Sequence, residues 1–549
     1  MFKKGTILIL VVIFLLALVL RFYKLSDFPV GFHIDEASLG YNAYSLMLTG
    51  NDDNGNSYPL YIDMFGDNRP SGYHYLTIVP VKIFGLTEFA TRLPAALFGS
   101  ISVFAIFALS MTLFKRKDIA LFAAFLLAIS PWHIIISRAS GEAVVALFFI
   151  MLGFAGVFSG LFEKNKWRII IGGLLLCGSF FVYHTPRLFV PLFFLVFLIY
   201  WYPQWKTQAK NIKVALLGVF FAISIIAVSL VFFVSGGTGR FSQVNIFSSF
   251  ETDFLQTQQI QEDALAGSPW ILSRAVHNKP TNVALVFISN YSEYFSPTFL
   301  FVQGGLPIWY QIPRMGLVYV VLLPFMLFGI YKVVISKSKE ERIPLIWLIT
   351  APIVPAITMD DIPNINRAIA MLPALEMLSA VGLVGMIFYF KERRRKIVAG
   401  FFIFLLLLNL GYFLHQYFYN AKVHKPWYRN NGFKEMMKVV DENYDKYDQI
   451  VMTKYQGGIY PIVLFYKKFD PKEYQDEGSP KNKDYGGFGK FVFVPQDCPS
   501  IQSTEAYVKK EKVLYIDKGD CQDDKTLKFR KHSYVSREDG TKAFRIVYE

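Results

Sequence analysis

The chain has 549 residues, of which 53% are hydrophobic, 17% aromatic and 18% charged, and its mean hydropathy is +0.36. These values exclude a soluble multidomain protein, a disordered chain, a collagen-like repeat and a small disulfide-stabilised protein, and they fit a polytopic membrane protein. The net charge of +14 does not indicate nucleic-acid binding, because the basic residues lie in short loops between apolar runs rather than in one stripe.

About eleven apolar runs predict transmembrane helices, each of which needs roughly 20 residues to cross a hydrocarbon core. The first run follows Lys3 and Lys4 but lacks a small-residue cleavage site, so we interpret it as a retained helix rather than a signal peptide. In chain order the runs are residues 5–22, 93–114, 119–136, 143–162, 169–182, 188–202, 214–234, 316–335, 343–358, 369–390 and 397–418.

Loop charges predict the orientation of these spans. Lysine and arginine are concentrated in alternate connections, such as residues 115–117, 164–168 and 391–396, and the positive-inside bias places such loops in the cytoplasm. We therefore expect a multi-pass protein of the cell membrane with a cytoplasmic amino terminus. The connections expected outside are the first outer loop (24–92), the turns at 137–142 and 184–187, the second outer loop (235–314) and the loop at 359–367.

Residues 1–418 are thus the predicted membrane domain, and residues 419–549 are a predicted extracytoplasmic α/β domain. Helical spacing over residues 433–444 and short β-prone runs at 449–453, 491–494, 512–516 and 543–547 indicate this fold. The tail shows no catalytic constellation, so we expect a structural or acceptor-recognition role. Cys498 and Cys521 would lie on the oxidising side, and the sequence leaves open whether they are bonded.

The first outer loop opens with the adjacent acids Asp35 and Glu36. From residue 36 to residue 48, apolar and aromatic residues recur at helical intervals, which predicts an interfacial amphipathic helix that begins at Asp35 or Glu36. Two interpretations remain open for the acids. Asp35 can be an N-cap with Glu36 in the first turn, or the pair can carry out chemistry.

Further ionisable side chains recur at the outer ends of other spans: Arg138 and Glu142, His184 and Arg187, and Arg367. Simpler interpretations exist, because Glu142 suits a helix amino terminus and Arg367 can extend to the membrane interface. If these groups converge on one face, the arginines can pair their donors with a phosphate. Arg367 and Arg187, with Arg138 and His184 behind them, are then the candidates for binding a donor phosphate.

A carboxylate on the same face could accept a proton from an incoming hydroxyl or amine. Together these groups suit the transfer of a group from a lipid-linked phosphate, which leaves as an anion and needs no protonation. One base is therefore enough, and no nucleotide-binding motif is required.

The order of these features resembles the GT-C class of polyprenyl-phosphate-dependent glycosyltransferases, and within it bacterial proteins similar to protein O-mannosyltransferases and the lipid A aminoarabinose transferase. The resemblance covers residues 2–418 and is most specific in the segments GFHIDEASLGYNAYSLMLTG and FATRLPAALFG. It implies a GT-C fold and an inverting transfer of one sugar from an undecaprenyl-phosphate-like donor to a glycan, lipid or protein acceptor.

The resemblance also implies roles for three acids. Asp35 falls at the catalytic position of the first outer loop, Glu36 completes the acidic pair, and Glu142 falls where relatives carry a second outer acid. Many relatives have a histidine shortly before the arginine at position 367, whereas this chain has Asn364 and Asn366 there. Some GT-C enzymes use a divalent metal, and the acids here could be ligands or a base with its hydrogen-bond partner.

The alternative from another class is a transporter or flippase of a lipid-linked or anionic substrate, because ionisable groups near membranes also line transport paths. The sequence shows neither inverted repeats nor a matched pair of broken helices, and its acidic pair lies in a loop rather than near the midplane. Glycosyl transfer is therefore the favoured hypothesis, with the sugar and the acceptor left open.

Overall fold

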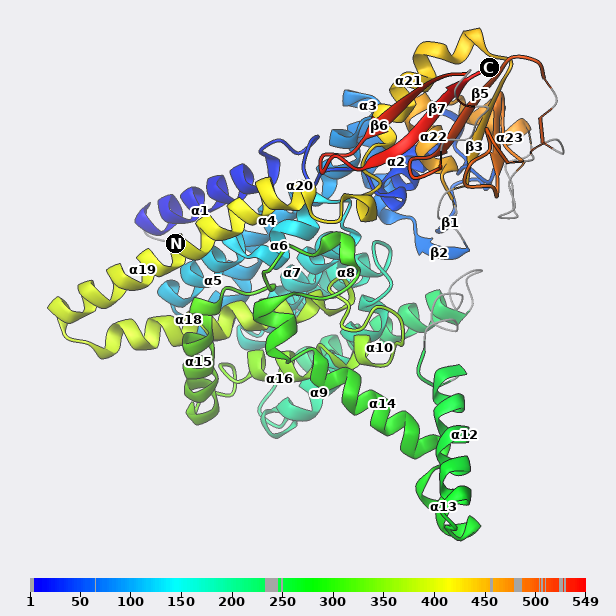
Figure 1. Ribbon diagram of the computed structural model, residues 1–549. Coiled ribbons are helices and arrows are strands. Elements are labelled where there is room, and N and C mark those ends of the chain that lie inside the picture. Colours follow the sequence, from blue (N-terminus) through cyan, green and yellow to red (C-terminus); the bar gives the residue numbers. More distant parts are fainter. Residues whose placement is uncertain are drawn as a thin grey trace. The chain divides into compact units, whose positions relative to one another are not determined.

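The computed structural model describes residues 4–64, 66–232, 245–247, 250–454, 458–477, 486–502, 504, 507–508, 510–522, 527 and 530–549. The chain divides into two compact units, shown in Figure 1. The helical unit contains the residues up to Arg21, Ala95–Ser137 and Gly141–Phe413. The sheet unit contains Phe22–Pro94, Arg138–Ser140 and Leu414–Glu549. The first outer loop therefore shares a unit with the carboxyl-terminal domain.

Seven helices among the described residues are long and apolar enough to cross a membrane. An eighth span results if the bent pair α5 (Lys117–Ile129) and α6 (Pro131–Arg138) is counted as one. The chain is accordingly a multi-pass membrane protein. The seven are α1 (Lys4–Phe22), α4 (Glu88–Phe114), α7 (Glu142–Phe162), α9 (Pro186–Trp205), α10 (Lys210–Phe232), η4 (Arg367–Met371) continuing into α18 (Leu372–Tyr389), and α19 (Glu392–His415) with the turns that follow it.

The other three predicted spans are also helical, but they are shorter. They are α8 (Lys166–Phe180), α15 (Leu323–Ile335) with the turn before it, and the pair α16 (Ile343–Thr350) and α17 (Ile353–Ala356). The expected count of about eleven is therefore reached only when these short helices are included, and length and hydropathy alone give seven or eight.

The bend between α5 and α6 has a clear physical cause and is compensated by neighbouring side chains. Pro131 has no N–H to donate, so backbone carbonyls at the end of α5 lose their helical partners. Arg21 donates to the carbonyl oxygens of Leu127 (3.1 Å) and Ala128 (2.9 Å), and the hydroxyl of Tyr319 donates to that of Ile129 (2.8 Å). These bonds satisfy polar groups that would otherwise be costly inside a membrane.

Small residues allow close packing between α15 and α18. A Cβ atom at Gly329 would overlap the carbonyl oxygen of Leu378, and one at Gly382 would overlap that of Phe325. Glycine at both positions lets the two backbones touch, which is a common way to pack helices in lipid.

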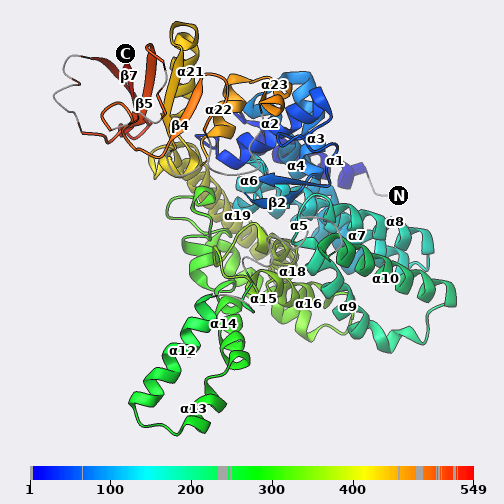
Figure 2. The same ribbon diagram turned by 90° about the vertical axis from the view of Figure 1, so that its right-hand side faces the viewer.

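The described part of the second outer loop is mostly helical. Figure 2 shows α12 and α13 at the end of an arm that α14 joins to the rest of the helical unit. At its base, the Asn290 side chain donates to the carbonyl oxygens of Ala356 (3.2 Å) and Thr358 (3.0 Å). The three helices are α12 (Phe250–Leu265), α13 (Trp270–Val276) and α14 (Lys279–Glu293).

The sheet unit is built on a five-stranded mixed sheet with the order β4-β3-β5-β7-β6. Strand β3 is parallel to β4 and β5, whereas β7 is antiparallel to β5 and β6. Alternate residues of β3 serve two cores, because Ile450 and Met452 pack on one face and Val451 on the other. The strands are β3 (Gln449–Thr453), β4 (Phe491–Val494), β5 (Val513–Lys518), β6 (Lys531–Ser536) and β7 (Lys542–Tyr548).

Helices and a hairpin from both ends of the chain complete this unit. The first outer loop contributes α2, α3 and the antiparallel pair β1 and β2, and α2 packs against α22 from the carboxyl-terminal domain. These elements are α2 (Ile34–Thr49), β1 (Tyr61–Met64), β2 (Asp67–Pro70), α3 (Gly72–Phe84), α20 (Ala421–Val423), α21 (Phe433–Asn443), α22 (Tyr460–Lys467) and α23 (Pro471–Asp476).

The four predicted strands and the predicted helix of the tail are all present, while β6 was not predicted. Its sequence, KHSYVS, is too polar to stand out as a strand, and it is an edge strand whose side chains are mostly exposed or partly exposed. Edge strands need less apolar surface than central ones.

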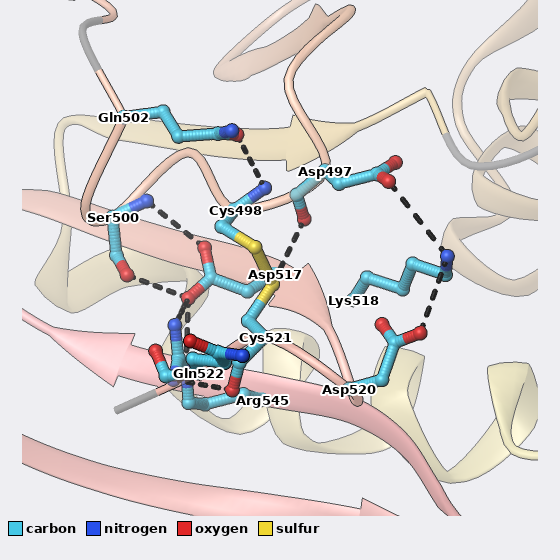
Figure 3. The surroundings of a disulfide bond; sticks show 10 residues. All are labelled: Asp497, Cys498, Ser500, Gln502, Asp517, Lys518, Asp520, Cys521, Gln522 and Arg545. Carbon is cyan, nitrogen blue, oxygen red and sulfur yellow. Dashed lines mark hydrogen bonds and ion pairs between the residues drawn. A yellow bond between two sulfur atoms is a disulfide. The ribbon is translucent and has the colours of Figure 1, made fainter. Parts of the chain in front are cut away.

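Cys498 and Cys521 form a disulfide, which settles the question that the sequence left open. Figure 3 shows the buried carboxylate of Asp517 beside it. This carboxylate accepts hydrogen bonds from Ser500 Oγ (2.5 Å) and Arg545 Nε (2.9 Å), and Arg545 also donates to the carbonyl oxygen of Cys521 (3.1 Å). The disulfide and the ion pair together connect the loop after β4 to β5 and β7.

We expect the double variant Cys498→Ser with Cys521→Ser to destabilise the sheet unit. The bond joins residues 23 positions apart, and closing a loop of that size constrains the unfolded chain by about 3 kcal/mol. The measurement is the thermal midpoint of purified protein in detergent. The control is Cys177→Ser, which removes the free cysteine of α8. Equal midpoints for the double variant and the wild type would contradict the prediction.

Candidate active site

The amino terminus of α2 holds the two candidate acids in different ways. The N-cap is His33, whose Nδ1 accepts from the backbone N–H of Asp35 (3.2 Å). Glu36 occupies the third helical position, and its Oε2 accepts from the backbone N–H of His33 (3.2 Å), which completes a capping box. The interpretation of Asp35 as the N-cap is therefore wrong, although Glu36 does lie in the first turn.

Helix α2 is also more buried than an interfacial amphipathic helix would be. Ala37 and Tyr41 pack into the core of the carboxyl-terminal domain, while Ala43 packs against Val81 and Ala90 on the other side. A Cβ atom at Gly40 would overlap Thr91 and Phe465, so its small size permits contact on two sides. The predicted helix is present, but it does not expose one polar face, because small residues, which periodicity counts weakly, let neighbours cover both sides.

The Glu36 carboxylate is the most heavily bonded group of the sheet unit's candidate site. Arg92 approaches it with two nitrogens, Nε to Oε1 at 2.9 Å and Nη2 to Oε2 at 3.2 Å. Arg429 Nη2 lies 2.8 Å from Oε2, and the backbone N–H of Ser140 donates to Oε1 at 3.2 Å. With His33, four separate chain segments converge on one side chain that is only 5% exposed.

Electrostatics hold this cluster in one protonation state. Burial opposes ionisation of Glu36, but Arg92 and Arg429 outweigh that cost and keep the pKa of the carboxyl below its usual value. Burial lowers the pKa of His33, so its ring stays neutral and its Nδ1 can accept the hydrogen bond from Asp35. Glu36 is therefore a charged anchor whose oxygens are occupied.

Asp35 is more accessible than its neighbour. Its side chain is 26% exposed, and its Oδ2 lies 3.1 Å from Arg69 Nη2. Arg69 is itself held by Asp67, whose Oδ2 accepts from Arg69 Nε at 3.2 Å. The hairpin of β1 and β2 thus places a guanidinium beside Asp35, and the carboxylate keeps contact with solvent.

Arg138, a candidate for the donor phosphate, also lies in the sheet unit. Its Nη2 donates to the carbonyl oxygens of Tyr23 (2.7 Å), Lys24 (3.4 Å) and Phe28 (3.2 Å). Its guanidinium also lies over the ring of Phe418, 5.2 Å from the ring centre. These contacts are those of an arginine that organises backbone rather than of one presented to a ligand.

The remaining candidates lie in the helical unit. Glu142 is buried in the first turn of α7, where a negative charge is favourable. Arg187 is also buried and donates through Nε (3.0 Å) and Nη2 (2.7 Å) to the carbonyl oxygen of Phe180, at the end of α8. The ring of His184 lies against that of Tyr183, with 4.4 Å between ring centres.

Arg367 forms a two-pronged ion pair within its own loop. Its Nη1 and Nη2 lie 2.7 and 2.8 Å from the two carboxylate oxygens of Asp360, and Nη1 also donates to Thr358 Oγ1 (2.9 Å). The side chain of Asn364 accepts from the backbone N–H of Arg367 (2.9 Å) and fixes the start of η4. Asn364, one of the two asparagines that stand where many relatives have a histidine, therefore caps the start of η4.

The structure thus brings Asp35, Glu36 and the turn at residues 138–140 together in one unit, while Glu142, His184, Arg187 and Arg367 belong to the other. Among the described residues, no group of three or more His, Cys, Asp or Glu side chains is arranged to hold a metal ion.

Sequence reasoning missed Arg69, Arg92 and Arg429 as parts of the site. Arg92 lies in the segment FATRLPAALFG, which carries the resemblance, but a role as the partner of Glu36 has no signal in local spacing. Arg429 is 393 positions from Glu36, so only the fold brings the two together.

Comparison with known structures identifies the fold. The structure of ArnT from Cupriavidus metallidurans bound to undecaprenyl phosphate matches 99% of this chain and 98% of its own length, with 12% identity and a TM-score of 0.55. The oligosaccharyltransferase AglB from Archaeoglobus fulgidus, in complex with an inhibitory peptide and a dolichol-phosphate, matches 84% of the chain with 14% identity and a TM-score of 0.50. The chain covers 64% of that archaeal protein. It therefore has the fold of the GT-C membrane glycosyltransferases.

A family comparison points the same way. The family described as dolichyl-phosphate-mannose-protein mannosyltransferase matches residues 68–232, which include Arg69, Arg92 and the turn at 138–140. No curated protein gives a significant sequence match. The resemblance to the GT-C class predicted from the sequence is thus confirmed.

We expect Glu36→Gln to destabilise the sheet unit by about 3–5 kcal/mol, because removing one partner of a buried ion pair leaves the other uncompensated. The measurement is thermal unfolding at pH 7. The control is Glu163→Gln, which breaks an exposed pair with Arg168 and should have little effect.

The lowered pKa of Glu36 predicts that the stability of the fold depends on pH. A carboxyl with a lowered folded-state pKa stabilises the fold above its unfolded value of 4.5, and that contribution is lost as the pH falls below it. His33, with a folded pKa below 6.5, acts in the same direction from a higher pH. Wild-type stability should therefore fall on acidification, and the loss below pH 4.5 should be smaller in Glu36→Gln. An equal loss in both proteins would contradict the assignment.

Proposed function

We propose that this protein transfers a single sugar from a polyprenyl-phosphate carrier to an acceptor on the outer face of the membrane, with inversion at the anomeric carbon. The GT-C fold and the mannosyltransferase family match support this function. So do the lipids in the matched structures, since ArnT was solved with undecaprenyl phosphate and AglB with a dolichol-phosphate.

The observation that carries the proposal is the contrast between the two adjacent acids at the start of α2. The carboxylate of Glu36 is buried and occupied by four residues, whereas that of Asp35 is partly exposed and oriented by Arg69. Asp35 is therefore the catalytic base of the proposed reaction, and Glu36 is a positioning residue.

The proposed step balances with one proton acceptor. The acceptor hydroxyl attacks the anomeric carbon from the face opposite the phosphate, a new carbon–oxygen bond forms, and the bond to the phosphate oxygen breaks. Asp35 takes the proton of the hydroxyl, a contribution typically worth about 10² to 10⁴-fold. Polyprenyl phosphate leaves as an anion. Arg69 holds the Asp35 carboxylate in place.

Arg367 remains our candidate for the donor phosphate, now together with Asp360. Both Nη atoms of Arg367 are bonded to the Asp360 carboxylate, so a donor phosphate would have to replace that carboxylate, which it can do because carboxylates and phosphates share this two-pronged geometry. Arg187 and Arg138, by contrast, already donate to backbone carbonyls. We infer that these two support the site without binding the phosphate.

Asp35→Asn should abolish measurable transfer while the thermal midpoint stays near that of wild type, because asparagine keeps the shape of the side chain but cannot accept the proton. The assay incubates purified protein with a panel of polyprenyl-phosphate-linked sugars and acceptors and measures release of free polyprenyl phosphate. Near-normal turnover by well-folded Asp35→Asn protein would reject Asp35 as the base. If wild-type protein releases no polyprenyl phosphate from any of the donors tested, the proposed function is rejected.

Arg367→Ala should weaken use of the donor by about tenfold or more, because a charged two-pronged hydrogen bond is worth roughly 1.5–3 kcal/mol. The readout is kcat/KM for the donor in the same release assay. A matched control is Arg342→Ala, which removes an arginine of the same unit that donates to the carbonyl oxygen of Ser336. An unchanged kcat/KM in folded Arg367→Ala would place the phosphate elsewhere.

The loop charges predict that the sheet unit is extracytoplasmic and the amino terminus cytoplasmic. Single cysteines in a Cys177→Ser background test this orientation. Tyr58→Cys and Lys531→Cys, both at exposed positions, should react with an impermeant thiol reagent in intact cells, whereas Arg394→Cys should not. The opposite labelling pattern would invert the topology.

A further inference from the structure

A cavity of about 370 Å³ lies within the sheet unit, between the beginning of the first outer loop and the segment that follows the last span. One wall contains residues 24–32, and the other contains residues 430–435 with Lys422, Tyr466 and Glu538. Its size is in the range of small-molecule sites. No step of the proposed reaction described above uses it.

The walls of this cavity are polar and nearly balanced in charge. Four carboxylates line it, and so do three lysines. A phosphate-binding site would carry an excess of positive charge, and a site for a basic peptide would carry an excess of negative charge. Mixed donors and acceptors beside the ring of Tyr466 instead suit a neutral ligand that is rich in hydroxyl groups. The carboxylates are Asp27, Glu88, Glu435 and Glu538, and the lysines are Lys24, Lys422 and Lys434.

Four polar side chains of the walls, those of Glu88, Tyr466, Lys434 and Asn430, have partners in the structure. Glu88 accepts from the hydroxyl of Tyr466 (3.1 Å) and lies 2.7 Å from the ammonium of Lys434. Asn430 accepts from the backbone N–H of Ile34 at 3.2 Å. This part of the wall is therefore held by contacts between its own side chains.

Asn431 is the exception, and it points to a ligand. The residue lines the cavity but is only 7% exposed, and its side-chain Nδ2 has no hydrogen-bond partner in the structure. An unpaired buried amide donor costs about 1–3 kcal/mol. Rotation of the side chain toward the cavity would let a hydroxyl group of a bound ligand satisfy it.

The cavity wall includes the segment that precedes the proposed catalytic base in the sequence. Phe32, in its wall, lies three positions before Asp35, and Asn430 binds the backbone of Ile34, the residue before Asp35. Gly31 fits here because a Cβ atom would overlap the carbonyl oxygen of Arg429. The cavity wall is thus bonded, through Asn430, to the first residue of α2, the helix that carries Asp35.

We propose that this cavity is the acceptor subsite and that the acceptor is a neutral, hydroxyl-rich glycan. The inference rests on the proposed function and names its acceptor class. Asn431 and Glu435 hold hydroxyl groups of the glycan, Tyr466 packs against a sugar ring, and a further hydroxyl of the chain reaches Asp35.

The test measures the binding of neutral tetrasaccharides of glucose, mannose, galactose and N-acetylglucosamine to the purified full chain in detergent, by saturation-transfer NMR. Glucose 1-phosphate and tetralysine serve as the anionic and cationic probes. We expect at least one neutral probe to bind with a Kd in the millimolar range or below, and to lose about tenfold in affinity in Asn431→Leu and Glu435→Gln. The control is Asn443→Ala, at the end of α21 and outside the cavity, which should bind as wild type does.

Several outcomes would overturn the proposal: no neutral probe binds, the variants bind as tightly as wild type, or glucose 1-phosphate or tetralysine binds in preference. Two variants are used because Asn431→Leu changes a buried position, whereas Glu435→Gln changes a surface position at the start of α21. Binding of undecaprenyl phosphate to wild type is measured in parallel. If wild type does not bind undecaprenyl phosphate, the result counts against the proposed function. If it binds undecaprenyl phosphate but no neutral glycan, the result counts against the acceptor subsite alone.

Discussion

The Glu36 carboxylate is the constraint on which the candidate site depends. A buried carboxylate is stable only when it is paired and hydrogen-bonded, and here the partners come from the N-cap, from Arg92, from Ser140 and from Arg429 of the carboxyl-terminal domain. These partners are dispersed along the chain, so satisfying one charge requires the first outer loop, the turn at 138–140 and the tail to meet. The start of α2, and with it Asp35, is positioned as a result.

The two adjacent acids lie in different surroundings, and the roles proposed for them rest on that difference. Consecutive residues in the first turn of a helix point in different directions, so that one side chain can be enclosed while the next faces solvent. Glu36 faces the arginines, and Asp35 faces Arg69 on the hairpin of the first outer loop. The arginines elsewhere show a comparable contrast, since Arg138 and Arg187 donate to backbone carbonyls whereas Arg367 holds a carboxylate in the geometry that suits phosphate.

The fold was largely predictable because its main signals are local. Hydropathy located the helices of the eleven predicted spans, and short β-prone runs located β3, β4, β5 and β7, although the polar edge strand β6 gave no such signal. The site was only partly predictable. Asp35 and Glu36 stand out as adjacent acids, but His33 as the N-cap and Arg429 as a partner follow from three-dimensional contacts that no local pattern encodes. Burial of α2 was missed because Gly40 and its small neighbours allow packing that periodicity does not reveal.

The division of roles between Asp35 and Glu36 is tested most directly by the pH dependence of kcat/KM for sugar transfer in Asp35→Glu beside wild type. If the carboxylate at position 35 takes the proton, the acid limb of the profile reports its pKa, and replacing aspartate with glutamate should move that limb while reduced transfer persists. An acid limb at the same pH in both proteins would show that another group is the base.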